Sequence, residues 1–195
     1  MKERPILFSG PMVRALLAGT KTQTRRVVKP QPTHFNPVGV PRRVIPTGGP
    51  SDVIRCPYGQ PGDRLWVRET WAYGIHALAA KRDENGPFVY AADGTTQGRL
   101  CDRWRPSIHM PRWASRITLE VTSVRVERLQ DIDLADALAE GISDTGALIL
   151  DSAGNEQGGP IAEYAVLWEQ INGSGSWAAN PWVWAIEFNQ TTATR

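Results

Sequence analysis

The clearest pattern along the chain is the alternation of apolar and polar residues that half-buried strands require. It is most regular from Arg116 to Arg128, a stretch rich in isoleucine, valine and threonine. From Arg64 to Thr70 the alternation places Leu65, Val67 and Glu69 on one face of a strand. Three shorter strands are expected, at 5–9, 87–92 and 181–188.

Three stretches have the spacing of helices instead. The first, at 12–18, is followed by a glycine that favours a helix end. Asp131 or Asp133 can cap a second helix that ends at Glu140, and Pro160 suits the first turn of a third. Short strands combined with three helices predict an α+β domain, in which a small curved or closed sheet is flanked by helices.

A length of 195 residues fits a single domain spanning 1–195 that carries insertions. The first expected insertion, at about 29–61, contains eight of the fifteen prolines and should be irregular. The second, at about 142–159, is rich in glycine and polar residues and should form a loop. A strand is expected directly after the first insertion, so this insertion does not separate two domains.

Composition excludes several classes of protein. With 41% hydrophobic and 22% charged residues, the chain is typical of a soluble globular protein. It has no apolar run of about 18 residues and no signal peptide at its start, so a cytoplasmic protein with no membrane partner is expected. A net charge of +2 is too small for wrapping duplex nucleic acid, although it permits a local basic patch. The two cysteines and three histidines lack metal-ligand spacing, so neither a metal nor a cofactor is expected.

The segment that follows the first helix is dense in cationic and hydroxyl side chains, Gly-Thr-Lys-Thr-Gln-Thr-Arg-Arg at 19–26. It is either a solvated basic turn or a source of positive charge and hydrogen-bond donors for a ligand. Gly19, Lys21, Thr24 and Arg26 fit the pattern G-x-K-x-x-T-x-R, which resembles the signature of the ASCH domain family in the PUA-like superfamily. Later stretches of the chain match the pattern of this family in the same order. The Trp-rich form of this sequence is similar to versions carried by bacteriophages and prophages.

This resemblance implies a PUA-like β-barrel and a role with RNA or modified nucleosides. Small members of the family are amidohydrolases of N(4)-acylcytidines such as N(4)-acetylcytidine, and others are reported as ribonucleases. The amidohydrolases bring a Lys, a Thr and a Glu together, which implies Lys21, Thr24 and Glu140 here. The leading hypothesis is therefore hydrolysis of an N(4)-acylated cytidine or related nucleoside. A non-catalytic RNA-binding module and a ribonuclease remain the alternatives.

Amide hydrolysis needs a nucleophile, a group that moves protons and a cation near the developing oxyanion, and these three residue types can supply them. The Thr24 hydroxyl is a weak nucleophile until a base removes its proton. Lys21 can be that base if its pKa falls, and in its charged form it instead stabilises an oxyanion. Glu140 can activate water or protonate the leaving amine.

Three further residues are candidates for binding the substrate. Arg26 either anchors the signature segment to a carboxylate or contacts a phosphate or base. Glu69 is either a second candidate for the catalytic carboxylate or an ion-pair partner of Arg68 or Arg26. Trp71 is one of eight tryptophans, and it either packs in the core or stacks on a base.

Overall fold

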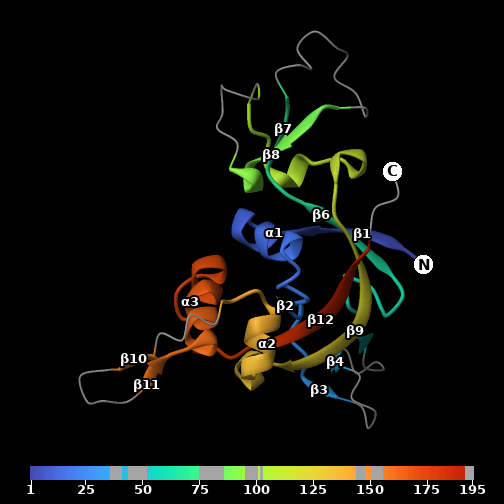
Figure 1. The fold of residues 1–195 in the computed structure, drawn as a ribbon. Coiled ribbons are helices and arrows are strands. Elements are labelled where there is room, and N and C mark those ends of the chain that lie inside the picture. Colours follow the sequence, from blue (N-terminus) through green and yellow to red (C-terminus); the bar gives the residue numbers. More distant parts are fainter. Residues whose placement is uncertain are drawn as a thin grey trace.

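The computed structural model describes residues 1–35, 41–43, 52–74, 86–94, 101, 103–143, 148–150 and 156–191. Its largest element is a five-stranded sheet with the strand order β1-β6-β9-β12-β2 (Figure 1). The pair β1–β6 is parallel and the other three pairs are antiparallel. The strands are β1 (Glu3–Leu7), β6 (Arg64–Arg68), β9 (Thr118–Arg128), β12 (Trp182–Thr191) and β2 (Gln23–Val27).

This sheet is open within the described residues, where β1 and β2 are its two end strands. The predicted α+β class is confirmed, but the described strands do not close into a barrel. The two longest strands, β9 and β12, pair along their length with a break in register between Glu187 and Phe188. Closure would require the two end strands, β1 and β2, to pair with each other, and no such pairing is found among the described residues.

The three predicted helices are present: α1 (Gly10–Leu17), α2 (Leu134–Ala139) and α3 (Pro160–Asn172). Of the two candidate caps of α2, Asp133 is the one whose side chain accepts a hydrogen bond from the Asp136 backbone. In Figure 1, α2 and α3 lie together near β2 and β12, while α1 lies nearer β1. No helix in the described part of the chain is long and apolar enough to cross a membrane.

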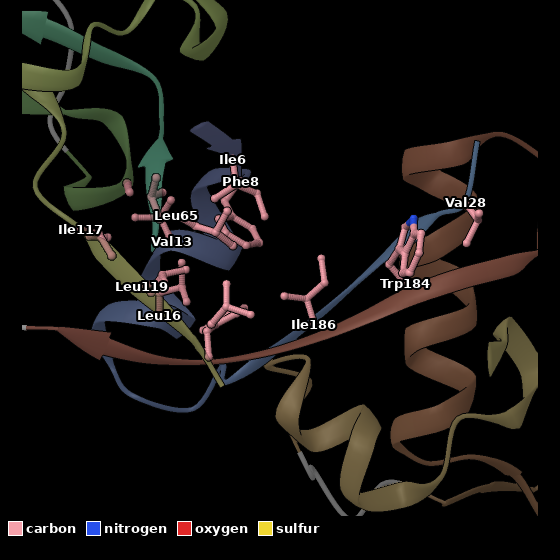
Figure 2. Packing of buried hydrophobic residues seen from close by; sticks show 14 of the residues in the cluster. Ile6, Phe8, Val13, Leu16, Val28, Leu65, Ile117, Leu119, Trp184 and Ile186 are labelled. Atoms are coloured by element: carbon pink, nitrogen blue, oxygen red, sulfur yellow. The ribbon is translucent and has the colours of Figure 1, made fainter. Parts of the chain in front are cut away.

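Two buried clusters hold these layers together. Val13 and Leu16 of α1 pack into a cluster that includes Leu65 and Leu119 of the sheet (Figure 2). A second cluster beneath α2 and α3 contains Ala137, Tyr164 and Trp168 among others. The sheet therefore has α1 on one face and the α2–α3 pair on the other.

A third, aromatic cluster surrounds β7 (Trp71–Tyr73) and β8 (Phe88–Tyr90), which form a hairpin-like pair beyond the end of the main sheet. The predicted strand at 87–92 is shorter than expected, because residues 91–93 turn into a 3-10 helix. The 3-10 helices among the described residues are η2 (Ala91–Asp93), η3 (Ser107–His109), η4 (Arg112–Ala114) and η5 (Leu129–Asp131).

Both expected insertions contain strands that the sequence did not predict. A three-stranded sheet of β3 (His34–Phe35), β4 (Pro41–Arg43) and β5 (Asp52–Val53) lies within 29–61. The strands β10 (Leu148–Leu150) and β11 (Glu156–Gly158) pair within 142–159. Strands of two or three residues are too short to show an alternating pattern, so the interpretation of both stretches as irregular was wrong for these residues.

Candidate functional site

A cavity of about 570 Å³ lies beside β2. Its walls come from the end of β1, from α1, β2 and α3, and from the residue that ends α2. Lys21, Thr24, Arg26 and Glu140 all line it, so four of the six site residues predicted from the sequence share one cavity. The structure therefore brings the lysine, threonine and glutamate to one cavity, and their chemical roles remain predictions.

The position of β2 explains how the cavity gathers these groups. Side chains alternate along the strand, so Thr24 and Arg26 point to one face of the sheet and Arg25 to the other. Because β2 is an end strand among those described, a cavity at its free edge is reached from both faces. Residues from both faces, Thr24 and Arg25 among them, accordingly line the cavity.

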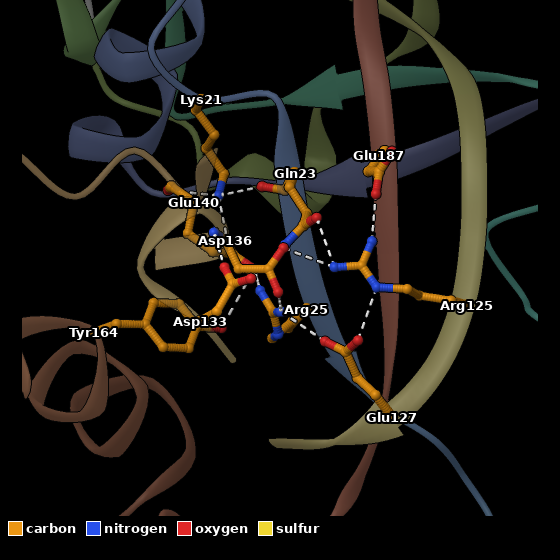
Figure 3. Close-up of polar contacts among 10 residues, drawn as sticks. All are labelled: Lys21, Gln23, Arg25, Arg125, Glu127, Asp133, Asp136, Glu140, Tyr164 and Glu187. Atoms are coloured by element: carbon orange, nitrogen blue, oxygen red, sulfur yellow. Dashed lines mark hydrogen bonds and ion pairs between the residues drawn. The ribbon is translucent and has the colours of Figure 1, made fainter. Parts of the chain in front are cut away.

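Lys21 is a buried cation whose three protons each have an acceptor (Figure 3). Its Nζ lies 2.8 Å from the Gln23 carbonyl oxygen, 2.8 Å from the Glu140 carbonyl oxygen and 2.8 Å from Glu140 Oε2. Burial lowers the pKa of Lys21 from its ordinary value, and the ion pair with Glu140 opposes that shift. Three donated hydrogen bonds are what an ammonium makes, so this geometry is that of the charged form.

Glu140 is held from several sides at the C-terminal end of α2. Its Oε1 lies 3.4 Å from Arg25 Nη1 and 3.4 Å from the Tyr164 hydroxyl, both of which donate to it. Gly141, with φ of 87°, has no side chain to separate the helix end from Lys21. A Cβ there would lie 3.1 Å from the Cβ of Lys21, so glycine permits the close approach of α2 to Lys21.

Arg25 anchors this part of β2 to carboxylates, a role that the sequence analysis gave to Arg26. Its Nη2 lies 2.6 Å from Glu127 and 2.6 Å from Asp136. Arg125 binds the same two carboxylates and also Glu187 (Figure 3). The correction has a simple cause: Arg25 is on the side of the strand that faces α2, and Arg26 is on the opposite side.

Arg26 instead contacts the strand β1 and the residue after it. Its Nη2 donates a hydrogen bond of 2.7 Å to the Leu7 carbonyl, and its guanidinium lies 5.2 Å from the centre of the Phe8 ring. Its Nε is buried and has no hydrogen-bond partner among the described residues. Within the described chain, no carboxylate forms an ion pair with Arg26.

Thr24 is buried in the cavity wall, where it pairs through its backbone with Ile186 of β12. Its hydroxyl makes no hydrogen bond to another described residue. Because Thr24 lines the cavity, its hydroxyl has hydrogen-bonding capacity left for a ligand or water there.

Glu69 and Trp71 do not line the cavity. Glu69 is buried and accepts two hydrogen bonds from Arg116, at 2.9 and 3.1 Å, so the expected pairing with Arg68 or Arg26 was wrong. Burial raises the pKa of Glu69, and Arg116 opposes that shift. Trp71 is in the aromatic cluster, with ring centres 5.9 Å from Phe88 and 5.8 Å from Trp113.

The aromatic residues that do line the cavity were not assigned to it from the sequence. They are Phe8, Tyr58, Tyr164 and Trp168. The i, i+4 spacing of Tyr164 and Trp168 places both on one face of α3, which is compatible with a core or with a cavity wall. The sequence pattern could therefore identify the face but not what it covers.

Neither a search for metal ligands nor a comparison with known proteins assigns a function to this site. No group of three or more His, Cys, Asp or Glu residues arranged to hold a metal ion is found in the described part of the chain. No protein-family model, curated protein or solved structure matches this chain. The case for a function therefore depends on the groups that line the cavity.

Proposed function

We propose that this chain hydrolyses the amide bond of an N(4)-acylated cytidine, or of a closely related modified nucleoside, without a metal ion. One observation carries the proposal: a buried Lys21–Glu140 ion pair and the free hydroxyl of Thr24 line the same cavity. The proposal includes membership of the ASCH domain family, in which the described sheet would correspond to part of a PUA-like barrel.

The size and lining of the cavity suit a nucleoside. Sites for small molecules have volumes of roughly 300–1,000 Å³, and this cavity has about 570 Å³. Tyr58 and Trp168 supply aromatic surface on which a flat base can stack. The polar groups are gathered on β2 and at the end of α2, so one part of the cavity is suited to the reaction and another to binding.

The proposed reaction proceeds through an acylated threonine. Thr24 Oγ1 attacks the acyl carbon, the bond from that carbon to N4 breaks, and N4 takes a proton to leave as the cytosine amine. Glu140 accepts the proton of Thr24 and transfers it to N4. Water then cleaves the ester, so that the net products are cytidine and the carboxylic acid.

Lys21 is assigned the stabilisation of the oxyanion rather than the role of base. A lysine that already donates three hydrogen bonds has no lone pair with which to accept a proton. The ammonium can redirect one of its N–H groups from a backbone carbonyl to the oxyanion, which carries more negative charge. Of the two roles left open by the sequence, the geometry thus favours electrostatic stabilisation.

A second candidate function is recognition of a base in RNA without catalysis. The observation that favours it is the same set of three acceptors around Lys21, because a lysine with a purely structural role would have them too. In that case Thr24 and the aromatic walls would bind a flipped-out base. Turnover distinguishes the two functions.

The deciding experiment is incubation of the pure protein with N(4)-acetylcytidine and detection of cytidine and acetate. We expect turnover that is unchanged by EDTA and lost in Glu140→Gln. Binding of the nucleoside with no release of cytidine would favour the RNA-binding alternative. Activity that EDTA removes and a divalent ion restores would contradict hydrolysis without a metal.

A further inference from the structure

The cations that line the cavity fall into two groups. Lys21 and Arg25 belong to a network with Arg125 in which four carboxylates, those of Glu127, Asp136, Glu140 and Glu187, face three cations. The charges of this network are therefore already compensated. Arg26 and Lys29 also line the cavity but lie outside the network.

The environment of Arg26 leaves most of its hydrogen-bonding capacity unused. A guanidinium has five N–H donors, and the described residues supply one acceptor to it, the Leu7 carbonyl. It is half-buried against the Phe8 ring, where an unpaired charge is costly. A planar donor group of this kind matches the oxygens of a phosphate.

We propose that the ligand of this cavity carries a phosphate, which Arg26 and Lys29 bind. The chemical class is a cytosine nucleotide, either a free nucleoside monophosphate or a residue within RNA. This inference rests on the proposed function, because it takes the cavity to be a nucleoside site. It adds a group that the neutral substrate N(4)-acetylcytidine lacks.

The arrangement along β2 separates the phosphate from the reacting bond. Thr24 and Arg26 are two residues apart on one face of the strand, which is about 6.6 Å at 3.3 Å per residue. Lys29 follows the end of β2 and is exposed to solvent. The acyl group can therefore approach Thr24 and Glu140 while the phosphate stays near Arg26 and the cavity entrance.

The inference is tested by calorimetric binding of cytidine, of cytidine 5′-monophosphate and of a cytidine trinucleotide to the full chain at low salt. We expect the monophosphate to bind at least tenfold more tightly than cytidine, and this advantage to shrink in high salt through screening. A further gain in affinity with the trinucleotide would identify a residue within RNA as the ligand. The absence of that gain would identify a free nucleotide.

Arg26→Met and Lys29→Met should each reduce the advantage of the monophosphate while leaving the affinity for cytidine nearly unchanged. Lys29 is exposed, so its variant keeps the test valid if Arg26→Met folds poorly. Arg128→Met is a matched control, since Arg128 also donates to a backbone carbonyl and lies over an aromatic ring, but outside the cavity.

Two results would overturn the inference. One is equal affinity for cytidine and its monophosphate, and the other is an advantage that survives both variants. Neither result would affect hydrolysis of N(4)-acetylcytidine, which is measured separately. Conversely, tight binding of the monophosphate with no release of cytidine from the acetylated nucleoside would remove the proposed reaction and leave the phosphate site.

Discussion

Lys21 and Glu140 are joined twice, once through their backbones and once through their side chains. They form an isolated antiparallel bridge, and Lys21 Nζ lies 2.8 Å from Glu140 Oε2. The pair ties the end of α2 to the segment that leads into β2. Loss of activity on changing either residue would therefore not by itself distinguish a catalytic role from a structural one.

Lys21→Met is expected to abolish turnover and to lower the free energy of unfolding by about 3 kcal/mol, because it leaves the Glu140 carboxylate buried without its nearest cation. The sequence suggested a smaller effect on stability, since Lys21 was expected in a polar loop. Urea unfolding and the release of cytidine measure the two effects.

The matched variants are Glu140→Gln and the double variant Lys21→Met with Glu140→Gln. Removing both charges should restore part of the stability without restoring activity. A folded Lys21→Met protein that hydrolyses the nucleoside at the parental rate would show that the chemistry lies elsewhere.

The pH dependence of the rate separates the two roles of Lys21. Since burial lowers the pKa of Lys21, an essential ammonium should lose its proton, and the rate should fall, at a pH below the ordinary lysine value of 10.5. A neutral lysine acting as a base would produce the opposite sign, a rate that rises through the same range. Lys21→Arg should be inactive in either case. The Lys21 side chain is almost fully enclosed, and the bulkier guanidinium of arginine does not fit the space that the ammonium occupies.

Thr24→Val should remove turnover and change the free energy of unfolding by less than about 1 kcal/mol, because the Thr24 hydroxyl has no hydrogen bond to lose within the described structure. Thr24→Ser should retain part of the activity. Thr70→Val is the control, since Thr70 also lines the cavity but is assigned no part in the reaction. Equal rates for Thr24→Val and the parent would exclude the threonine as nucleophile.

Glu69→Gln should destabilise the protein by about 1–3 kcal/mol while the folded protein keeps its turnover number. Its carboxylate holds Arg116, which also binds Asp93, and it does not line the cavity. The comparison with Glu140→Gln decides which glutamate acts in catalysis. Loss of turnover in a stably folded Glu69→Gln protein would reverse the assignment.

The sequence predicted the main elements because their signals are local. The alternation in β9 and the stop signals after α1 and α2 each depend on a few neighbouring residues. Glu140 was assigned to the site through the family resemblance, from its place at the end of a helix, and the structure places it beside Lys21. The exchange of roles between Arg25 and Arg26 was beyond the sequence, because it depends on which face of β2 is covered by α2.

The tryptophans also show that local sequence signals do not predict which residues line the cavity. Trp71 was a candidate for stacking on a base, yet it packs with Phe88 and Trp113, while Trp168 lines the cavity. Both are buried, and both have an indole N–H without a described partner. Only the packing of α3 beside β2 distinguishes them, and that contact joins residues far apart in the chain.

The outer edge of β2, which has no strand neighbour among the described residues, also bears on whether separate molecules associate. The backbones of Thr22 and Val28 form hydrogen bonds with β12 and the residue register is regular between them, so every second residue directs its N–H and C=O toward β12. The backbone groups of Gln23, Arg25 and Val27 therefore face away from β12. An accessible edge of this kind would be a template for strand addition by another copy, but Gln23 and Arg25 are buried. Lys21 Nζ already donates a hydrogen bond to the Gln23 carbonyl. Arg26 and Lys29, which lie outside the compensated network, would repel a second such edge, so the residues assigned to the phosphate would also oppose self-association.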